Sequence, residues 1–78
     1  MKEPDYFDEL KGTIVEVATK FLEDGSYFLY KGILAKKGRD FIYLRNGEIF
    51  RVKEEKSKIG EFDRFALNKS IVSWVNFG

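Results

Sequence analysis

The sequence predicts a small, mostly β domain in which a short N-terminal helix precedes a strongly bent five-stranded antiparallel sheet that forms a small barrel. Apolar residues follow the two-residue period of strands over most of the chain. Turn signals, among them Asp24-Gly25 and Asn46-Gly47, separate these segments at short intervals. With 78 residues the chain has room for one core, so we assign residues 1–78 to a single domain.

The N-terminal segment carries the signals of a helix over residues 4–11. Pro4 suits the first turn, acidic residues follow it, and the segment ends in Lys-Gly. Because so short a helix is not stable alone, we expect it to lie on the sheet. Three apolar residues at helical spacing form the stripe that would pack there: Tyr6, Phe7 and Leu10.

The first two predicted strands form a hairpin. The first strand begins at Thr13, and Asp24-Gly25 is the turn signal that ends the segment. Residues 26–36 return with apolar side chains on both faces, which predicts a strand covered on both sides. Gly32 lies in its middle and predicts the bend or bulge that curls a sheet into a barrel. One face of the first strand carries Val15, Val17 and Phe21.

Two shorter strands are predicted next. A Lys-Gly turn leads into residues 41–44, and Asn46-Gly47 is the strongest type I′ hairpin signal in the chain. Residues 48–54 would return as the fourth strand. Residues 56–65 carry mixed charge and a glycine without apolar alternation, which predicts an inserted surface loop.

The last strand and the aromatic content predict self-association. Residues 70–77 carry apolar side chains on both faces, including Trp74, and an open edge of that kind aggregates unless another chain covers it. The chain also holds eight Phe, four Tyr and one Trp, a large aromatic content for so small a core. We therefore expect some rings to face a partner chain or a ligand.

Composition argues against most enzyme classes. His and Cys are both absent, which removes the commonest general base, the imidazole and thiolate metal ligands, and every nucleophile that depends on them. Carboxylate pairs remain, but they fall at a helix start or in polar segments where solvated charge is the ordinary role, so a carboxylate-based enzyme is only a third hypothesis. We expect no catalytic activity, no cofactor and no bound metal.

The same composition bears on location. Without cysteine the chain suits a reducing compartment. It has neither an apolar run of about 18 residues, as a membrane span needs, nor a signal-peptide core. We expect a cytoplasmic protein with no membrane partner.

Two basic segments are candidates for nucleic-acid binding. The net charge of +1 argues against bulk attraction, so an anion site has to be a local patch. Phosphate pairing and base stacking need cations and aromatic rings together, and a predicted hairpin tip offers this combination. The alternative is that the tip is simply polar and solvated. The candidate residues are Lys36, Lys37, Arg39 and Phe41 at the tip, with Asn68 and Lys69 before the last strand.

The order of these segments resembles the motifs of the Sm-like (LSm/Hfq-type) protein family. An N-terminal helix, an alternating strand over residues 12–17 and an Asp-Gly turn at residues 22–25 are similar to the start of its first motif. Residues 30–34, Tyr-Lys-Gly-Ile-Leu, are similar to the aromatic residue and Gly-x-Leu that end it. Residues 67–72 resemble the second motif, in which a basic residue in a tight turn precedes an apolar strand.

This resemblance implies a ribonucleoprotein function. Family members form rings, here of about five to seven copies, in which strand four of one subunit pairs with strand five of the next. Their single-stranded RNA binds at the inner rim, which implies bases stacked on Phe41 or Arg39 and phosphates held by lysines of the two segments. The leading hypothesis is a non-catalytic RNA-binding homo-oligomeric ring. The alternative is a structural or protein-interaction module that uses the same ring without RNA.

Overall fold

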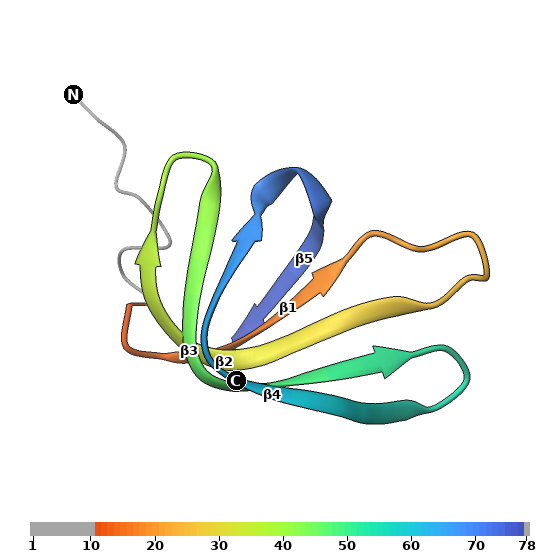
Figure 1. Cartoon of the computed structure of the whole chain (residues 1–78). Helices are drawn as coiled ribbons and strands as arrows, with labels where there is room; N and C mark the ends of the chain where they lie inside the picture. Colours follow the sequence, from red (N-terminus) through yellow and green to blue (C-terminus); the bar gives the residue numbers. More distant parts are fainter. Residues whose placement is uncertain (1–10, 78) are drawn as a thin grey trace.

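A computed structural model describes residues 11–77 as one five-stranded antiparallel sheet (Figure 1). A short 3-10 helix joins the last two strands. The strands follow the order β4-β3-β2-β1-β5 across the sheet, so β4 and β5 are its edges. The mostly β class and the five antiparallel strands are confirmed. The elements are β1 (Ile14–Thr19), β2 (Tyr27–Lys37), β3 (Phe41–Val52), β4 (Lys56–Asn68), η1 (Lys69–Ile71) and β5 (Val72–Phe77).

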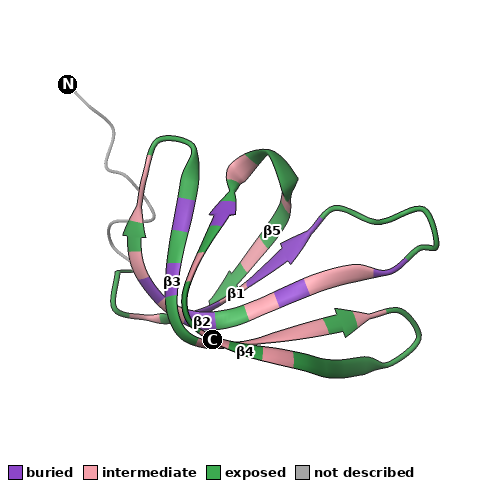
Figure 2. Cartoon of the chain, in the orientation of Figure 1, coloured by how far each residue is buried: buried purple, intermediate pink, exposed green. Residues whose placement is uncertain are grey.

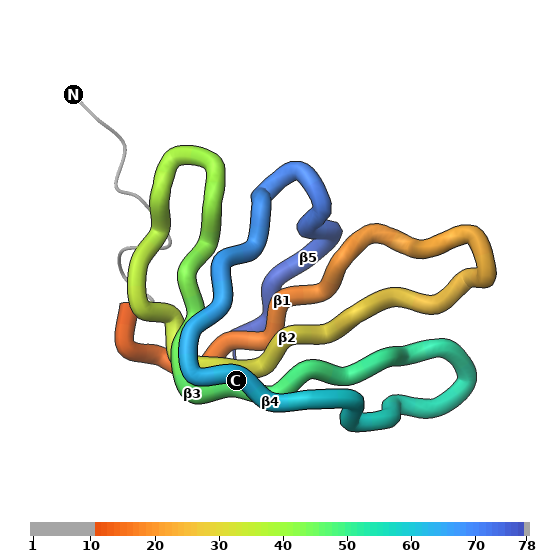
Figure 3. Tube along the Cα trace, viewed as in Figure 1, coloured from red at the N-terminus to blue at the C-terminus, as the bar shows by residue number. Residues whose placement is uncertain are grey.

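The sheet is strongly bent, but it does not close into the predicted barrel. β2, β3 and β4 each turn sharply, and Figure 3 shows the three bends together at one corner of the molecule. The sheet is open because β5 (six residues) pairs with β1 along one edge and, within the described part of the chain, has no ladder to β4 along the other. Each edge strand therefore presents backbone N–H and C=O groups to which another chain can pair.

The predicted N-terminal helix cannot be compared with the structure, because residues 4–10 lie outside the described residues. Lys11, its last predicted residue, lies in a turn. Residues 11–77 contain no α-helix, and none of their helical segments has the length and apolar character to cross a membrane.

Close backbone approach explains the bend. The β2–β3 register slips between the pairs Lys31↔Glu48 and Ile33↔Arg45, so β3 has one residue more than β2 there. Such a bulge bends the strand and increases its twist. A Cβ on Gly32 would lie 3.1 Å from the Arg45 carbonyl oxygen, and a Cβ on Gly47 would overlap the Lys31 carbonyl oxygen. The strands can meet this closely because both positions are glycine, and the bend predicted at Gly32 is confirmed.

The predicted hairpin at Asn46-Gly47 is wrong, because these residues form the bulge inside one long strand, β3. A type I′ turn needs positive φ at both central residues. Asn46 has φ 50°, but the described glycines with positive φ are Gly12 and Gly25. The chain turns back later, at residues 53–55, and residues 48–52 of the strand predicted over 48–54 form the second half of β3.

The predicted surface loop over residues 56–65 is also wrong, because it is the first part of β4. β4 is an edge strand whose side chains are mostly exposed, and Leu67 is its one fully buried residue. Backbone pairing to β3 holds it, so it needs no apolar alternation. Figure 2 shows that this part of β4 is mostly exposed.

One compact apolar cluster lies inside the bent sheet. Its side chains come from β1, β2, β3 and β4, and half-buried residues of β5 pack against it. Phe21 is not part of this core, since β1 ends at Thr19 and the Phe21 side chain is 72% exposed beyond it. The fully buried members are Val15, Val17, Leu34, Ile42, Leu44 and Leu67.

Candidate nucleic-acid interface

The first predicted basic segment is the tip of the β2–β3 hairpin. The Gly38 N–H donates a hydrogen bond of 2.8 Å to the Phe41 carbonyl oxygen, which closes a tight turn. A Cβ on Gly38 would lie 3.0 Å from the ring of Tyr43, so the aromatic ring packs over the turn. Arg39 and Asp40 project from this turn and are exposed.

The second basic segment is the corner between β4 and β5. The Asn68 side-chain oxygen accepts a hydrogen bond of 2.9 Å from the Ser70 N–H and caps η1. The Lys69 N–H donates to the Asp40 carbonyl oxygen at 2.8 Å, and Asn68 is the cross-strand partner of Phe41. The fold therefore joins the corner to the base of the tip.

The six predicted site residues lie in these two joined segments, which we call the basic rim. Lys36 and Arg39 are exposed, and the Phe41 side chain is 39% exposed. Asn68 is exposed too, but its side chain already serves as a helix cap. The two half-buried lysines, Lys37 and Lys69, lie where the tip and the corner meet the sheet.

Three residues that sequence reasoning missed lie beside the basic rim. Tyr43 is 38% exposed and its ring centroid is 6.3 Å from that of Phe41. Arg45 follows on the same face of β3, and its cross-strand partner on β4 is Arg64. The two-residue spacing from Phe41 to Arg45 was the available signal, but it was hidden by the expectation of a turn immediately afterwards.

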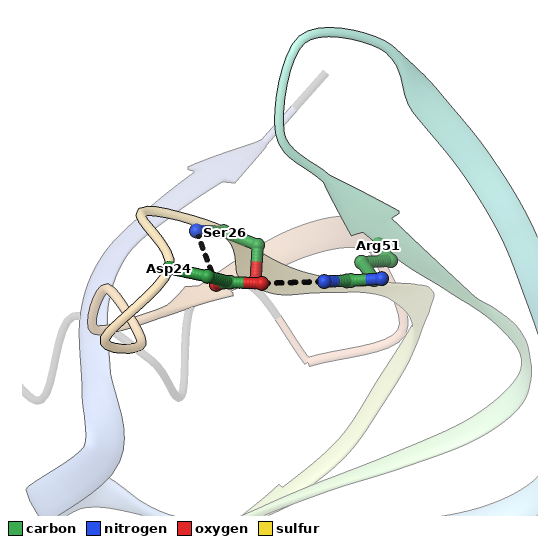
Figure 4. Close-up of polar contacts among 3 residues, drawn as sticks. All are labelled: Asp24, Ser26 and Arg51. Carbon is green, nitrogen blue, oxygen red and sulfur yellow. Dashed lines mark hydrogen bonds and ion pairs between the residues drawn. The ribbon is translucent and has the colours of Figure 1, made fainter.

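A second polar cluster is structural. The carboxylate of Asp24 accepts hydrogen bonds from the hydroxyl and the backbone N–H of Ser26, at 2.5 and 2.9 Å (Figure 4). Its other oxygen lies 2.5 Å from the guanidinium of Arg51. The Ser26 hydrogen bonds, followed by Arg51, lower the pKa of Asp24 to about 2. The cluster fastens the β1–β2 turn to the far end of β3.

The basic rim has the chemistry of a surface that binds anions and aromatic rings. Cations supply charge-assisted hydrogen bonds, and exposed Phe41 and Tyr43 supply faces on which bases can stack. No group of three or more acidic residues that could hold a metal ion occurs in residues 11–77. Comparison with protein-family models gives no match, and neither does comparison with curated protein sequences.

Proposed function

We propose that the protein is a non-catalytic RNA-binding subunit of a homo-oligomeric ring, as its resemblance to Sm-like proteins implies. The observation that carries the proposal is the junction at the basic rim. The backbone hydrogen bond from Lys69 to Asp40 and the pairing of Phe41 with Asn68 bring two basic segments, distant in sequence, to one surface. Phosphates would contact the lysines, and bases would stack on Phe41 or Arg39.

The two open edges of the sheet support the ring. In the family that the chain resembles, the fourth and fifth strands pair between neighbouring subunits. Here the fourth strand is β4, not the predicted strand over residues 48–54, and β4 and β5 are the two edges of the sheet. Trp74 on β5 is 44% exposed, which leaves apolar area for a neighbour to cover. In a closed ring of about five to seven copies the rim cations repeat, so a chain of net charge +1 acquires a strongly positive annulus.

A second function, a protein-interaction ring without RNA, is favoured by one apolar surface. Phe21, Leu22 and Ile71 line an open hollow between the β1–β2 turn and η1, and all three are exposed. Phe21 makes an edge contact with Tyr27, whose ring in turn meets Trp74. A peptide or an assembly component with apolar side chains would fit this hollow.

Salt-dependent RNA binding separates the two functions. Lys36→Gln and Lys69→Gln should weaken binding of oligo(U) and flatten the salt dependence, because log affinity falls with log salt at roughly −0.7 per phosphate contacted. Phe41→Ala should cost roughly 1–3 kcal/mol with the slope nearly unchanged, since stacking is less sensitive to salt. Fluorescence polarisation with labelled oligonucleotides measures both quantities.

Two control variants match these changes in type. Lys53→Gln removes an exposed cation from the β3–β4 turn, and Phe21→Ala removes an exposed ring from the hollow beside η1, which is not part of the basic rim. Both should bind RNA as the unaltered protein does. If oligo(U), oligo(A) and mixed RNA all fail to bind at low salt, where surface charges act most strongly, the RNA function is excluded and the protein-interaction ring takes its place.

A further inference from the structure

A pair of arginines lies on the exposed face of β3 and β4, next to the basic rim. Arg45 and Arg64 are direct cross-strand partners and both are exposed. Like charges placed directly opposite each other on neighbouring strands destabilise a sheet. Among residues 11–77 neither arginine has an acidic partner. The fold therefore carries a repulsion that its described residues do not relieve.

The same two strands also place two acidic residues opposite each other, and here a cation offsets the repulsion. Glu48 and Glu61 are also cross-strand partners. The Lys58 ammonium lies 3.1 Å from the Glu48 carboxylate and 2.5 Å from the Glu61 carboxylate, so one cation bridges both. By contrast, no described anion bridges the arginine pair. An anion from outside the chain would neutralise the repulsion between the two arginines, as Lys58 neutralises the repulsion between the two glutamates.

The surroundings of the arginine pair suit a nucleotide. Arg45, Arg64 and Tyr43 line one open hollow, and the rest of its lining is apolar: Ala35, Leu44, Phe65 and Ala66. Tyr43 pairs with Ala66 across the strands, so the small side chain leaves one side of the ring open. The Tyr43 ring also contacts Phe41, which makes the hollow continuous with the basic rim.

We infer that Arg45 and Arg64 together hold a backbone phosphate of single-stranded RNA whose neighbouring base stacks on Tyr43. Two guanidinium groups present planar forks of N–H donors that match phosphate oxygens. The exposed tyrosine supplies the stacking face beside them. This site rests on the proposed RNA-binding function and extends it, because it would bind the RNA beyond the basic rim, along the outer face of β3 and β4.

The test compares Arg45→Gln and Arg64→Gln with Arg51→Gln, in the full chain. Arg51 lies on the same strand as Arg45 but is paired with Asp24, away from the hollow. With an 18-nucleotide oligo(U), each variant of the arginine pair should bind about 5- to 30-fold more weakly and lower the salt slope by about 0.7, as loss of one phosphate contact predicts. Arg51→Gln should keep the affinity and slope of the unaltered protein.

Thermal unfolding without RNA supplies the second measurement. Removing one arginine of a repelling pair should leave the melting temperature unchanged or raise it, so weaker binding is not the result of unfolding. A lower melting temperature in both variants would overturn the inference, because the arginines would then stabilise the fold itself. Unchanged affinity and slope in both variants would overturn it too, while Lys69→Gln still reports on the basic rim. If the unaltered protein binds no oligonucleotide, the proposed function and this site are both excluded.

Discussion

Replacing Gly47 by alanine tests how the sheet is bent. A Cβ at this position would overlap both the Lys31 carbonyl oxygen and the Phe62 ring. The ring can shift, but the carbonyl belongs to the paired backbone of β2 and cannot move without disturbing the ladder. Overpacking of this kind costs about 1–3 kcal/mol. A loss of about 2 kcal/mol corresponds to a fall of roughly 8–16 °C in the melting temperature of so small a domain.

Gly60→Ala is the matched control, since Gly60 also lies in a long strand next to the bend. The nearest atom to its added Cβ is the Ile49 Cδ1 at 3.9 Å, an ordinary contact, and its φ is not positive. This variant should be stabilised by about 0.4–1 kcal/mol, because alanine restricts the unfolded chain. Circular dichroism melts of both variants measure the difference. If Gly47→Ala melts as high as Gly60→Ala, close backbone approach does not build the bend.

Two further predictions concern pH and assembly. The Asp24 carboxyl has a pKa of about 2 in the fold against an ordinary 3.8, so its stabilising effect is complete above about pH 4 and is lost as the pH falls toward 2. In the Asp24→Asn variant the free energy of unfolding should therefore depend less on pH in this interval. Glu23→Gln, at the neighbouring residue, should leave that dependence unchanged. Acid titrations followed by fluorescence measure both. If the protein assembles into the proposed ring, Trp74→Glu should reduce the mass measured by light scattering, because an unpaired charge at an apolar interface is costly. An unchanged mass would place Trp74 outside the interface.

Local signals predicted the start of the sheet well. β2 was expected over residues 26–36 and occupies Tyr27–Lys37, and the turn at Asp24-Gly25 forms with Gly25 at φ 81°. Both results depend on neighbouring residues, namely apolar spacing along one strand and a glycine that tolerates positive φ. The Lys-Gly turn at the hairpin tip was also predictable from neighbouring residues, although Gly38 does not have positive φ.

Tertiary packing decided the second half of the sheet. Asn46-Gly47 carries the same kind of local signal as Asp24-Gly25, yet it becomes a bulge because β3 continues past it to pair with β2 on both sides of the bend. Residues 56–65 carry no strand pattern, and they form a strand because a long partner offers them backbone hydrogen bonds. A period-two apolar pattern arises where one face of a strand is buried. An exposed edge strand buries few side chains, so its sequence need not show this pattern.

The candidate site, like the sheet, was predictable from the sequence in one part and not in another. The sequence by itself determined that cations and an aromatic ring crowd residues 36–41, since these residues are neighbours in the chain. Only the tertiary structure decided that Lys69 lies against this tip and that Arg45 faces Arg64. Cross-strand register depends on where bulges and bends fall, and those depend on contacts such as Phe62 against Gly47 that join residues far apart in the sequence.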